Sequence, residues 1–493
     1  MASDVVDRFL SRAAARPNDI AISAQSGDMS YGALERRVRA LAARFAQARE
    51  ARILIALPPS ADAYASMLAS GMAGGFHTPV NLASPPEKLR KIASALDPAV
   101  IVGGGDVASK LAPAAPAAEI VDPATLDESR QFEGAGSRHR LAYVMFTSGS
   151  TGAPKGVMVS RAALAHYVAW LASMGAGPGD RLSQQPNLAF DISMTDVFGA
   201  LCYGATLCPI ETTIDRLTPA RFIARQRITV WNSTPSTVSL MIKAGQLRRA
   251  NVSSVRLFNF CGEPLLRQHL DAIFEATPHA IVRNTYGPTE ATIAMTSLSL
   301  TAESYLRHCR ASVALGLPIE GMDIALVGGP TAEEGELVIM GPQLADGYWK
   351  DPERTAQAFK QVSSAGHRLG YFTGDWVERC GGQLYFRERM DFQLKVRGHR
   401  VEADEVAAAI RDCGLAAAVV FKREEVLVAL VERPEDGEGL DEPALQKALR
   451  TKLEAYAVPE RIRMVDSIPR NENDKIDRQE AAALFERLIE GER

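Results

Sequence analysis

The sequence predicts an α/β protein: a large N-terminal domain of layered α/β subdomains plus a β-rich portion, followed by a small α+β C-terminal domain. Three observations predict this class. Apolar runs of strand length alternate with amphipathic helical patterns between residues 52 and 102, and the alternation returns between residues 189 and 300. The composition then changes after Met390, which places the domains at 1–390 and 391–493.

The first hundred residues carry the clearest alternation. After a short N-terminal helix, Ser30 precedes a helical pattern with Leu34, Val38, Leu41 and Phe45 on one face, which should pack on a sheet. We then expect strands and helices in turn, with strands over 52–57 and 99–102 and helices over 61–73 and 86–96.

Residues 104–140 are rich in alanine, proline and charge, and predict a loosely structured connection. A buried strand over 141–146 follows, then a polar loop, a strand over 157–159 and a helix that Ser160 would cap. Later elements are a strand over 335–341, a helix over 351–359, a hairpin over 393–401, a helix over 403–411, strands over 416–421 and 425–431, and a helix over 445–455.

Composition limits the function. The 493 residues carry a net charge of -4, so no broad basic field is available for nucleic acid, and a small-molecule or protein partner is favoured. No apolar run is long enough to span a membrane, and acidic residues near the N-terminus are unlike a signal peptide, so we expect a cytoplasmic protein. Six cysteines without a CxxC pair and eight scattered histidines argue against zinc or a disulfide framework.

The loop from Thr147 to Gly156 contains four hydroxyl side chains, three glycines and one lysine. Glycines let several backbone N–H groups converge on one anion, while hydroxyls and Lys155 add donors and charge, so the loop suits a polyphosphate. A polar surface turn is the alternative. It is not a Walker loop, because Pro154 precedes Lys155 and no Ser or Thr follows it.

Three later segments carry polar groups suited to a nucleotide. The stretch from Asn284 to Glu290 combines an amide, an aromatic ring and a carboxylate around a Gly-Pro turn, and Asp375 could hold ribose hydroxyls. Lys475 lies in a polar segment near the C-terminus. Alone, each could be a capped loop or a solvated charge.

Together these motifs, in this order, resemble those of the adenylate-forming superfamily of acyl-CoA synthetases, luciferases and amino-acid adenylation domains. The resemblance implies an ATP-dependent, AMP-forming ligase that uses Mg2+ at Glu290. It implies nucleotide contacts at Thr147, Ser148, Gly149, Ser150, Thr151, Gly152, Gly262, Glu263, Asn284, Thr285, Tyr286, Gly287, Thr289, Asp375 and Arg389.

The resemblance also implies a mobile C-terminal domain. Asp391 would be its hinge, Lys475 and Lys155 would be catalytic, and the Gly398 region would help form a channel for a thiol. Two residues depart from the family pattern, since Glu388 and Asp474 stand where glycine is usual.

Asp191 points to the class of acid. Its carboxylate would be costly to bury without a cation, although a turn cap explains it equally well from the residues alone. The surrounding segments resemble D-alanine:carrier-protein ligases over most of the chain, which implies that Asp191 binds the substrate's α-ammonium. The implied amino-acid site comprises Asp191, Ile192, Thr195, Asn232, Asn259, Cys261, Thr285, Ile293, Ala294 and Lys475.

The polarity of Thr195, Asn232 and Asn259 predicts a small neutral amino acid that is alanine-like, or serine-, threonine- or asparagine-like, of either handedness. We expect no ionisable residue along this wall. The leading hypothesis is a stand-alone enzyme that makes aminoacyl-AMP and loads the phosphopantetheine thiol of a separate carrier protein, as in nonribosomal peptide synthesis. The alternatives are an acyl- or aryl-CoA ligase and a non-catalytic nucleotide-binding scaffold.

Overall fold

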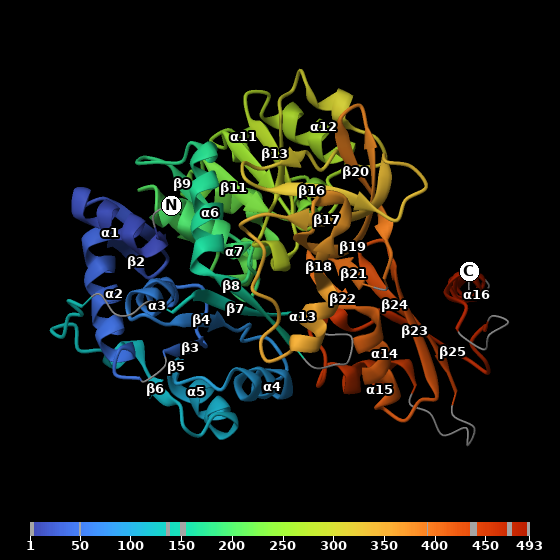
Figure 1. Ribbon diagram of the computed structural model, residues 1–493, viewed down its shortest axis with the longest axis horizontal. Coiled ribbons are helices and arrows are strands. Elements are labelled where there is room, and N and C mark those ends of the chain that lie inside the picture. The colour runs from blue at the N-terminus through green and yellow to red at the C-terminus, as the bar shows by residue number, and fades with distance from the viewer. Residues whose placement is uncertain are drawn as a thin grey trace. The chain divides into compact units, whose positions relative to one another are not determined.

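The structure is a computed structural model that describes residues 4–48, 51–134, 139–147, 154–391, 393–433, 441–470 and 476–490. Contacts divide the chain into two compact units. The larger unit comprises Met1–Leu82, Ala93–Phe146 and Gly156–Met390, and the smaller comprises Ala83–Ile92, Thr147–Lys155 and Asp391–Arg493. The predicted α/β class is confirmed, and Figure 1 labels the elements.

A six-stranded sheet forms the first layer of the larger unit, and its pairs β5–β6, β3–β5, β3–β4 and β4–β7 are parallel. Its order is β6 (Glu119–Val121), β5 (Val100–Val102), β3 (Arg52–Ile55), β4 (Phe76–Pro79), β7 (Leu141–Thr147) and β8 (Lys155–Ser160). The accompanying helices are α2 (Tyr31–Phe45), α3 (Ala61–Met72) and α5 (Gly105–Leu111), while most of α4 (Pro86–Leu96) belongs to the smaller unit. As expected, Ser30 caps α2 through the backbone N–H of Ala33.

A nine-stranded sheet forms the second layer. Its order is β15 (Leu317–Pro318), β14 (Thr296–Leu300), β13 (Ile281–Tyr286), β12 (Leu257–Phe260), β11 (Val230–Ser233), β9 (Arg181–Gln184), β10 (Thr206–Pro209), β1 (Ile20–Ala24) and β2 (Gly27–Ser30). Strands β9 to β13 run parallel, so their carboxyl ends meet at one edge. The helices are α1 (Val5–Ala15), α6 (Arg161–Trp170), α7 (Ser193–Leu201), α8 (Thr213–Leu217), α9 (Pro219–Gln226), α10 (Pro235–Lys243), α11 (Arg249–Val252) and α12 (Arg267–Ala276).

The β-rich portion is an antiparallel sheet. It contains β16 (Asp323–Val327), β17 (Glu334–Met340), β18 (Phe359–Val362), β19 (Arg368–Cys380) and β20 (Gln383–Arg389), with α13 (Pro352–Ala358) before β18. Glu388 pairs with Trp376 in the β19–β20 ladder, so the local strand geometry accommodates a side chain where the family pattern has glycine.

The smaller unit combines a hairpin, a three-stranded sheet and helices. The hairpin is β21 (Gln393–Val396) and β22 (His399–Glu402), and the sheet is β23 (Ala417–Arg423), β24 (Val426–Glu432) and β25 (Arg461–Val465). Alternate residues of β23 and β24 join different apolar clusters, as the period of two requires. The helices are α14 (Ala403–Arg411), α15 (Glu442–Leu449) and α16 (Arg478–Glu490).

Three expectations need correction. Residues 104–140 contain α5 and the edge strand β6, because an alanine-rich stretch still supplies apolar residues such as Val121 to the core. The hairpin β1–β2 was not predicted, since both strands are short and β2 has no buried residue. The helix expected over 445–455 is α15, which begins earlier, at Glu442 beside Pro443, and ends earlier, at Leu449.

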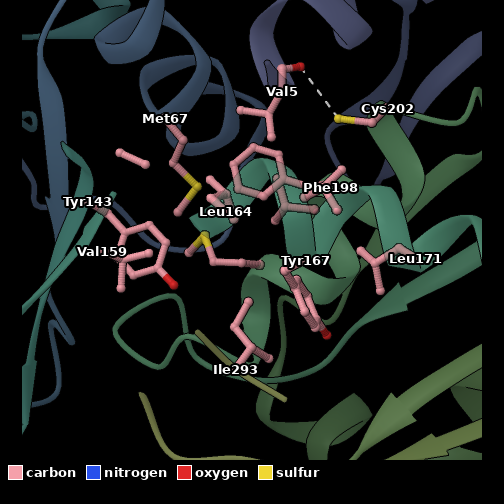
Figure 2. Close-up of a cluster of buried hydrophobic side chains, with 14 of the residues drawn as sticks. Val5, Met67, Tyr143, Val159, Leu164, Tyr167, Leu171, Phe198, Cys202 and Ile293 are labelled. Atoms are coloured by element: carbon pink, nitrogen blue, oxygen red, sulfur yellow. Dashed lines mark hydrogen bonds between the residues drawn. The ribbon is translucent and has the colours of Figure 1, made fainter. Parts of the chain in front are cut away.

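The core of the larger unit joins its two layers. Figure 2 shows Tyr143 of β7, Leu164 and Tyr167 of α6, and Phe198 of α7 in one buried cluster that also includes Ile293. Within the described ranges, no helix has the length and apolar character that crossing a bilayer requires.

Candidate functional site

The residues predicted to bind ribose lie together in the larger unit. The Tyr286 hydroxyl donates to Asp375 Oδ2 at 2.5 Å, and Arg389 Nη1 donates to Asp375 Oδ1 at 2.9 Å. Asp375 and Arg389 are direct partners in the β19–β20 ladder, while Tyr286 ends β13. Burial, followed by the Asp375 charge, raises the pKa of Tyr286, so this hydroxyl stays a hydrogen-bond donor.

Glu290, the predicted magnesium ligand, is fully buried just after the Gly-Pro turn. Its Oε1 accepts a hydrogen bond from the Tyr348 hydroxyl at 2.8 Å, which orients the carboxylate. Mg2+ commonly binds through one or two carboxylates together with substrate phosphate oxygens, so this residue fits the ion.

The two ends of the predicted phosphate loop are held by adjacent strands, because Thr147 ends β7 and Lys155 begins β8. The remaining loop residues of the prediction, Ser148 to Gly152, lie outside the described residues, as does Lys475.

The other predicted nucleotide contacts lie at strand ends of the nine-stranded sheet. Gly262 has φ +92°, a left-handed conformation that suits glycine, and Glu263 Oε2 accepts from the Ser236 backbone at the start of α10. Asn284 Nδ2 donates to the Ala314 carbonyl at 2.8 Å, so part of its amide is already used. Thr289 is partly exposed at the start of the turn that contains Glu290.

The predicted amino-acid residues gather around Tyr167. Thr195, on α7, lies 2.8 Å from the Tyr167 hydroxyl, and Asp191 precedes the same helix in a half-buried turn with Ile192. Burial raises the pKa of Tyr167, and the charges of Cys261 and Asp191 raise it further. Burial, followed by the Asp191 charge, raises the pKa of Tyr143, so the Asp191 carboxylate acts electrostatically on both phenols.

Ile293 and Ala294 follow a strained turn. Thr292 and Ile293 have φ values of +55° and +76°, which is unusual for β-branched residues and is typical of functional sites. Figure 2 shows Ile293 at the lower edge of the buried cluster that contains Tyr167. Cys261 Sγ lies 3.8 Å from the Ile293 carbonyl.

Gly287 has no side chain, so its backbone can lie close to the strained turn at Ile293 and Ala294. A Cβ built on Gly287 would lie 2.7 Å from Ala294 Cα, which is closer than real Cβ atoms come. Thr285 lies two residues earlier, on β13, and its hydroxyl donates to the Phe260 carbonyl. Residues predicted to bind the nucleotide and residues predicted to bind the amino acid therefore lie on the same stretch of chain.

Asp196 and Arg283 border the predicted side-chain wall and were missed by the sequence reasoning. Asn232 and Asn259 are direct partners on β11 and β12, and Asn259 is the partner of Arg283 on β13. Asn232 Nδ2 donates to Asp196 of α7 at 2.5 Å. The expectation that no ionisable residue borders the wall is therefore wrong, since Asp196 and Arg283 flank it. The sequence offered one signal for both residues: Asp196 follows Thr195, and Arg283 lies two residues before Thr285.

Asp391 and Gly398 belong to the smaller unit. Asp391 is exposed and its Oδ1 accepts from the Gln393 backbone at 3.2 Å. Arg397 and Gly398 form the two-residue loop of the β21–β22 hairpin with φ values of +48° and +82°, as a type I′ turn requires.

Comparison with known proteins covers both units. A family model described as AMP-binding enzyme matches residues 9–349, and one described as AMP-binding enzyme C-terminal domain matches residues 406–475. The chain is 30% identical over 508 residues to the D-alanine--D-alanyl carrier protein ligase of Lacticaseibacillus rhamnosus, covering 97% of this chain and 98% of that protein. It is 27% identical over 495 residues to the ligase of the same name from Staphylococcus aureus, covering 98% and 99%.

Among solved structures, the Vibrio cholerae adenylation domain AlmE in complex with glycyl-adenosine-5'-phosphate is 25% identical. It superimposes with a TM-score of 0.82 and covers 99% of this chain and 98% of that chain.

Proposed function

Because the chain belongs to the AMP-binding enzyme family and is an ATP-dependent, AMP-forming ligase, we propose that its acid substrate is a small neutral amino acid. The enzyme converts the amino acid to aminoacyl-AMP and then transfers the aminoacyl group to the phosphopantetheine thiol of a carrier protein. The observation that carries the proposal is that Asp191, in the half-buried turn before α7, acts electrostatically on the buried phenols of Tyr143 and Tyr167, and that the Tyr167 hydroxyl contacts Thr195 of the same helix.

Asp191 supplies the negative charge that an amino acid needs. A carboxylate in a half-buried turn pairs favourably with the α-ammonium of a zwitterion, whereas a fatty or aromatic acid offers no cation. The strained Ile293 and the thiol of Cys261 provide the apolar part of a small side-chain site.

The nucleotide half of the reaction depends on charge. Joining a carboxylate to the α-phosphate of ATP brings two anions together, so cations and fixed donors lower the barrier. We assign this role to Lys155 and Lys475, with Tyr286, Asp375 and Arg389 holding the ribose. Glu290 would hold Mg2+, which would neutralise phosphate charge.

The second half-reaction needs a thiol. The names of the D-alanyl carrier protein ligases support a carrier protein as its source. We assign the hinge to Asp391 and part of the thiol channel to the tight turn at Gly398, where the glycine has no side chain to obstruct the backbone.

Amino-acid-dependent exchange of labelled pyrophosphate into ATP tests the proposal. We expect exchange with one or more small neutral amino acids from a panel of both enantiomers, and transfer of the same amino acid to a phosphopantetheinylated carrier protein. Exchange only with acetate or benzoate would instead indicate an acyl- or aryl-CoA ligase. No exchange with any acid would indicate a scaffold without turnover.

A further inference from the structure

Three buried polar side chains cross the nine-stranded sheet in one line. This polar row consists of Asn232 on β11, Asn259 on β12 and Arg283 on β13, which are partners in successive parallel pairs. Partners in register lie on the same face of the sheet, with about 4.8 Å between strands. The three residues are 0%, 4% and 8% exposed, at positions where a covered parallel sheet normally carries apolar side chains.

The row contains two acceptors that the protein leaves unfilled. Asn232 uses Nδ2 to bind Asp196, which turns its Oδ1 away from that carboxylate. Across the described ranges, neither Asn232 Oδ1 nor Asn259 Oδ1 has a hydrogen-bond partner, although both atoms are buried. Buried carbonyl oxygens without donors are costly, so an occupant that supplies hydrogen-bond donors is expected.

The row also contains one unfilled donor. Arg283 donates through Nη1 and Nη2 to the side chain and carbonyl of Ser173, and its guanidinium lies 5.4 Å from the centre of the Trp170 ring. Its Nε is buried and has no acceptor in the described part of the chain, where Arg283 also forms no salt bridge. Burial lowers the pKa of Arg283, but an arginine remains charged at neutral pH.

We propose that the polar row is the specificity determinant of the amino-acid site and that it receives a side-chain carboxamide, so that the substrate is asparagine or a close analogue. This inference rests on the proposed function. A carboxamide NH2 offers two hydrogens to the oxygens of Asn232 and Asn259, and its carbonyl accepts from Arg283 Nε. A hydroxyl offers one hydrogen and a methyl none, while a carboxylate leaves both oxygens unfilled.

Asp196 acts as a positioning residue in this arrangement. It does not need to touch the substrate, because its carboxylate fixes which end of the Asn232 amide faces away from α7. An Asp196→Asn variant keeps an acceptor for Asn232 Nδ2 and should retain the selectivity. Asp196→Leu should raise KM for asparagine and leave KM for ATP unchanged.

Pyrophosphate exchange with the isosteric set asparagine, aspartate and leucine tests the proposal on the full chain. We expect kcat/KM for asparagine to exceed that of the other two by at least about 100-fold, as a site with unfilled polar groups demands. Arg283→Met and Asn259→Leu should each lower kcat/KM for asparagine at least about 10-fold and raise that for leucine, with KM for ATP unchanged. The exposed Arg249→Met is the matched control and should behave as the parent protein.

The outcomes separate the two proposals. Exchange that prefers alanine or threonine, or that ignores Arg283→Met, overturns the polar row while the proposed function stands. Exchange that prefers aspartate overturns both the polar row and the small neutral substrate. Failure with every amino acid overturns the proposed function itself. If the variants do not fold, thermal stabilisation of the unmodified protein by asparaginyl and leucyl sulfamoyl adenosines decides, and a larger shift with the leucyl compound overturns the inference.

Discussion

Asp191 is the residue on which the proposed substrate class depends. It lies in the turn before α7, and its charge adds to burial in raising the pKa of both Tyr143 and Tyr167, whereas Asp196 contributes to the pKa of Tyr167. A single carboxylate in this position can distinguish an amino acid from a simple acid.

Replacing Asp191 by Asn should lower amino-acid-dependent pyrophosphate exchange at least about 100-fold, because the buried ammonium loses its counter-charge. Binding of ATP, measured by calorimetry with a non-hydrolysable analogue, should not change. The exposed Asp106→Asn serves as the control. Unchanged exchange in Asp191→Asn would remove the residue from the site.

Asp375 should act on the nucleotide alone. Its two oxygens already bind Tyr286 and Arg389, so Asp375→Asn weakens charge-assisted hydrogen bonds at the predicted ribose position. We expect KM for ATP to rise about 10-fold or more, in line with the loss of one such bond, while KM for the amino acid stays the same. Glu388→Gln, on the neighbouring strand, is the control, and an equal rise there would contradict the assignment.

At the scale of elements, the turn from Ala291 to Ala294 is held in its strained form by Gln343. The Gln343 Nε2 donates to the carbonyl of Ala294 at 2.8 Å, and its backbone carbonyl accepts from the Thr292 hydroxyl at 2.7 Å. His166 of α6 lies 2.9 Å from Gln343 Oε1 and fixes the amide. A fully buried side chain from the loop after β17 thus shapes the wall near Tyr167.

Removing this support should loosen the wall. Gln343→Ala should reduce the free energy of unfolding by about 3 kcal/mol, because buried carbonyls lose their donor, and should raise KM for the amino acid more than KM for ATP. Urea unfolding and exchange kinetics measure the two effects. Gln361→Ala, at an exposed position of β18, is the control. A stable variant with normal KM values would show that the turn keeps its conformation without the Gln343 side chain.

At the scale of the whole molecule, the larger unit contains a buried neutral histidine. His77 of β4 lies 3.0 Å from the Ser70 hydroxyl, and burial, with the Arg161 charge, lowers its pKa to about 3. All four tryptophans, at positions 170, 231, 349 and 376, also lie in the larger unit, so tryptophan fluorescence reports its unfolding without the smaller unit.

The folded protein should lose stability as the pH falls from about 6.5 towards 3. In that window the unfolded chain binds a proton at His77 and the folded chain does not, which costs about 1.4 kcal/mol per pH unit. We expect His77→Gln to show a shallower decline between pH 6.5 and 5 in urea titrations followed by fluorescence. The exposed His279→Gln should keep the slope of the parent protein, and a parallel decline in all three would exclude His77 as its source.

The sequence alone determined the layered α/β class, because strand-length apolar runs and helical periodicity recur in segments long enough to be distinguished. It also determined the family, since motifs such as Asn284 to Glu290 are local and keep their spacing along the chain. Short edge elements such as β6 were missed because their few residues carry no periodic signal.

Only the tertiary structure decided which distant residues share a wall. Asn232, Asn259 and Arg283 become neighbours through the register of three parallel strands, and Asp196 reaches Asn232 from a helix. Register depends on how whole strands pack and not on the residues beside each motif, so no local pattern specifies it. The support that Gln343 gives to the turn from Ala291 to Ala294 has the same origin, because a fold brings together groups that the chain keeps apart.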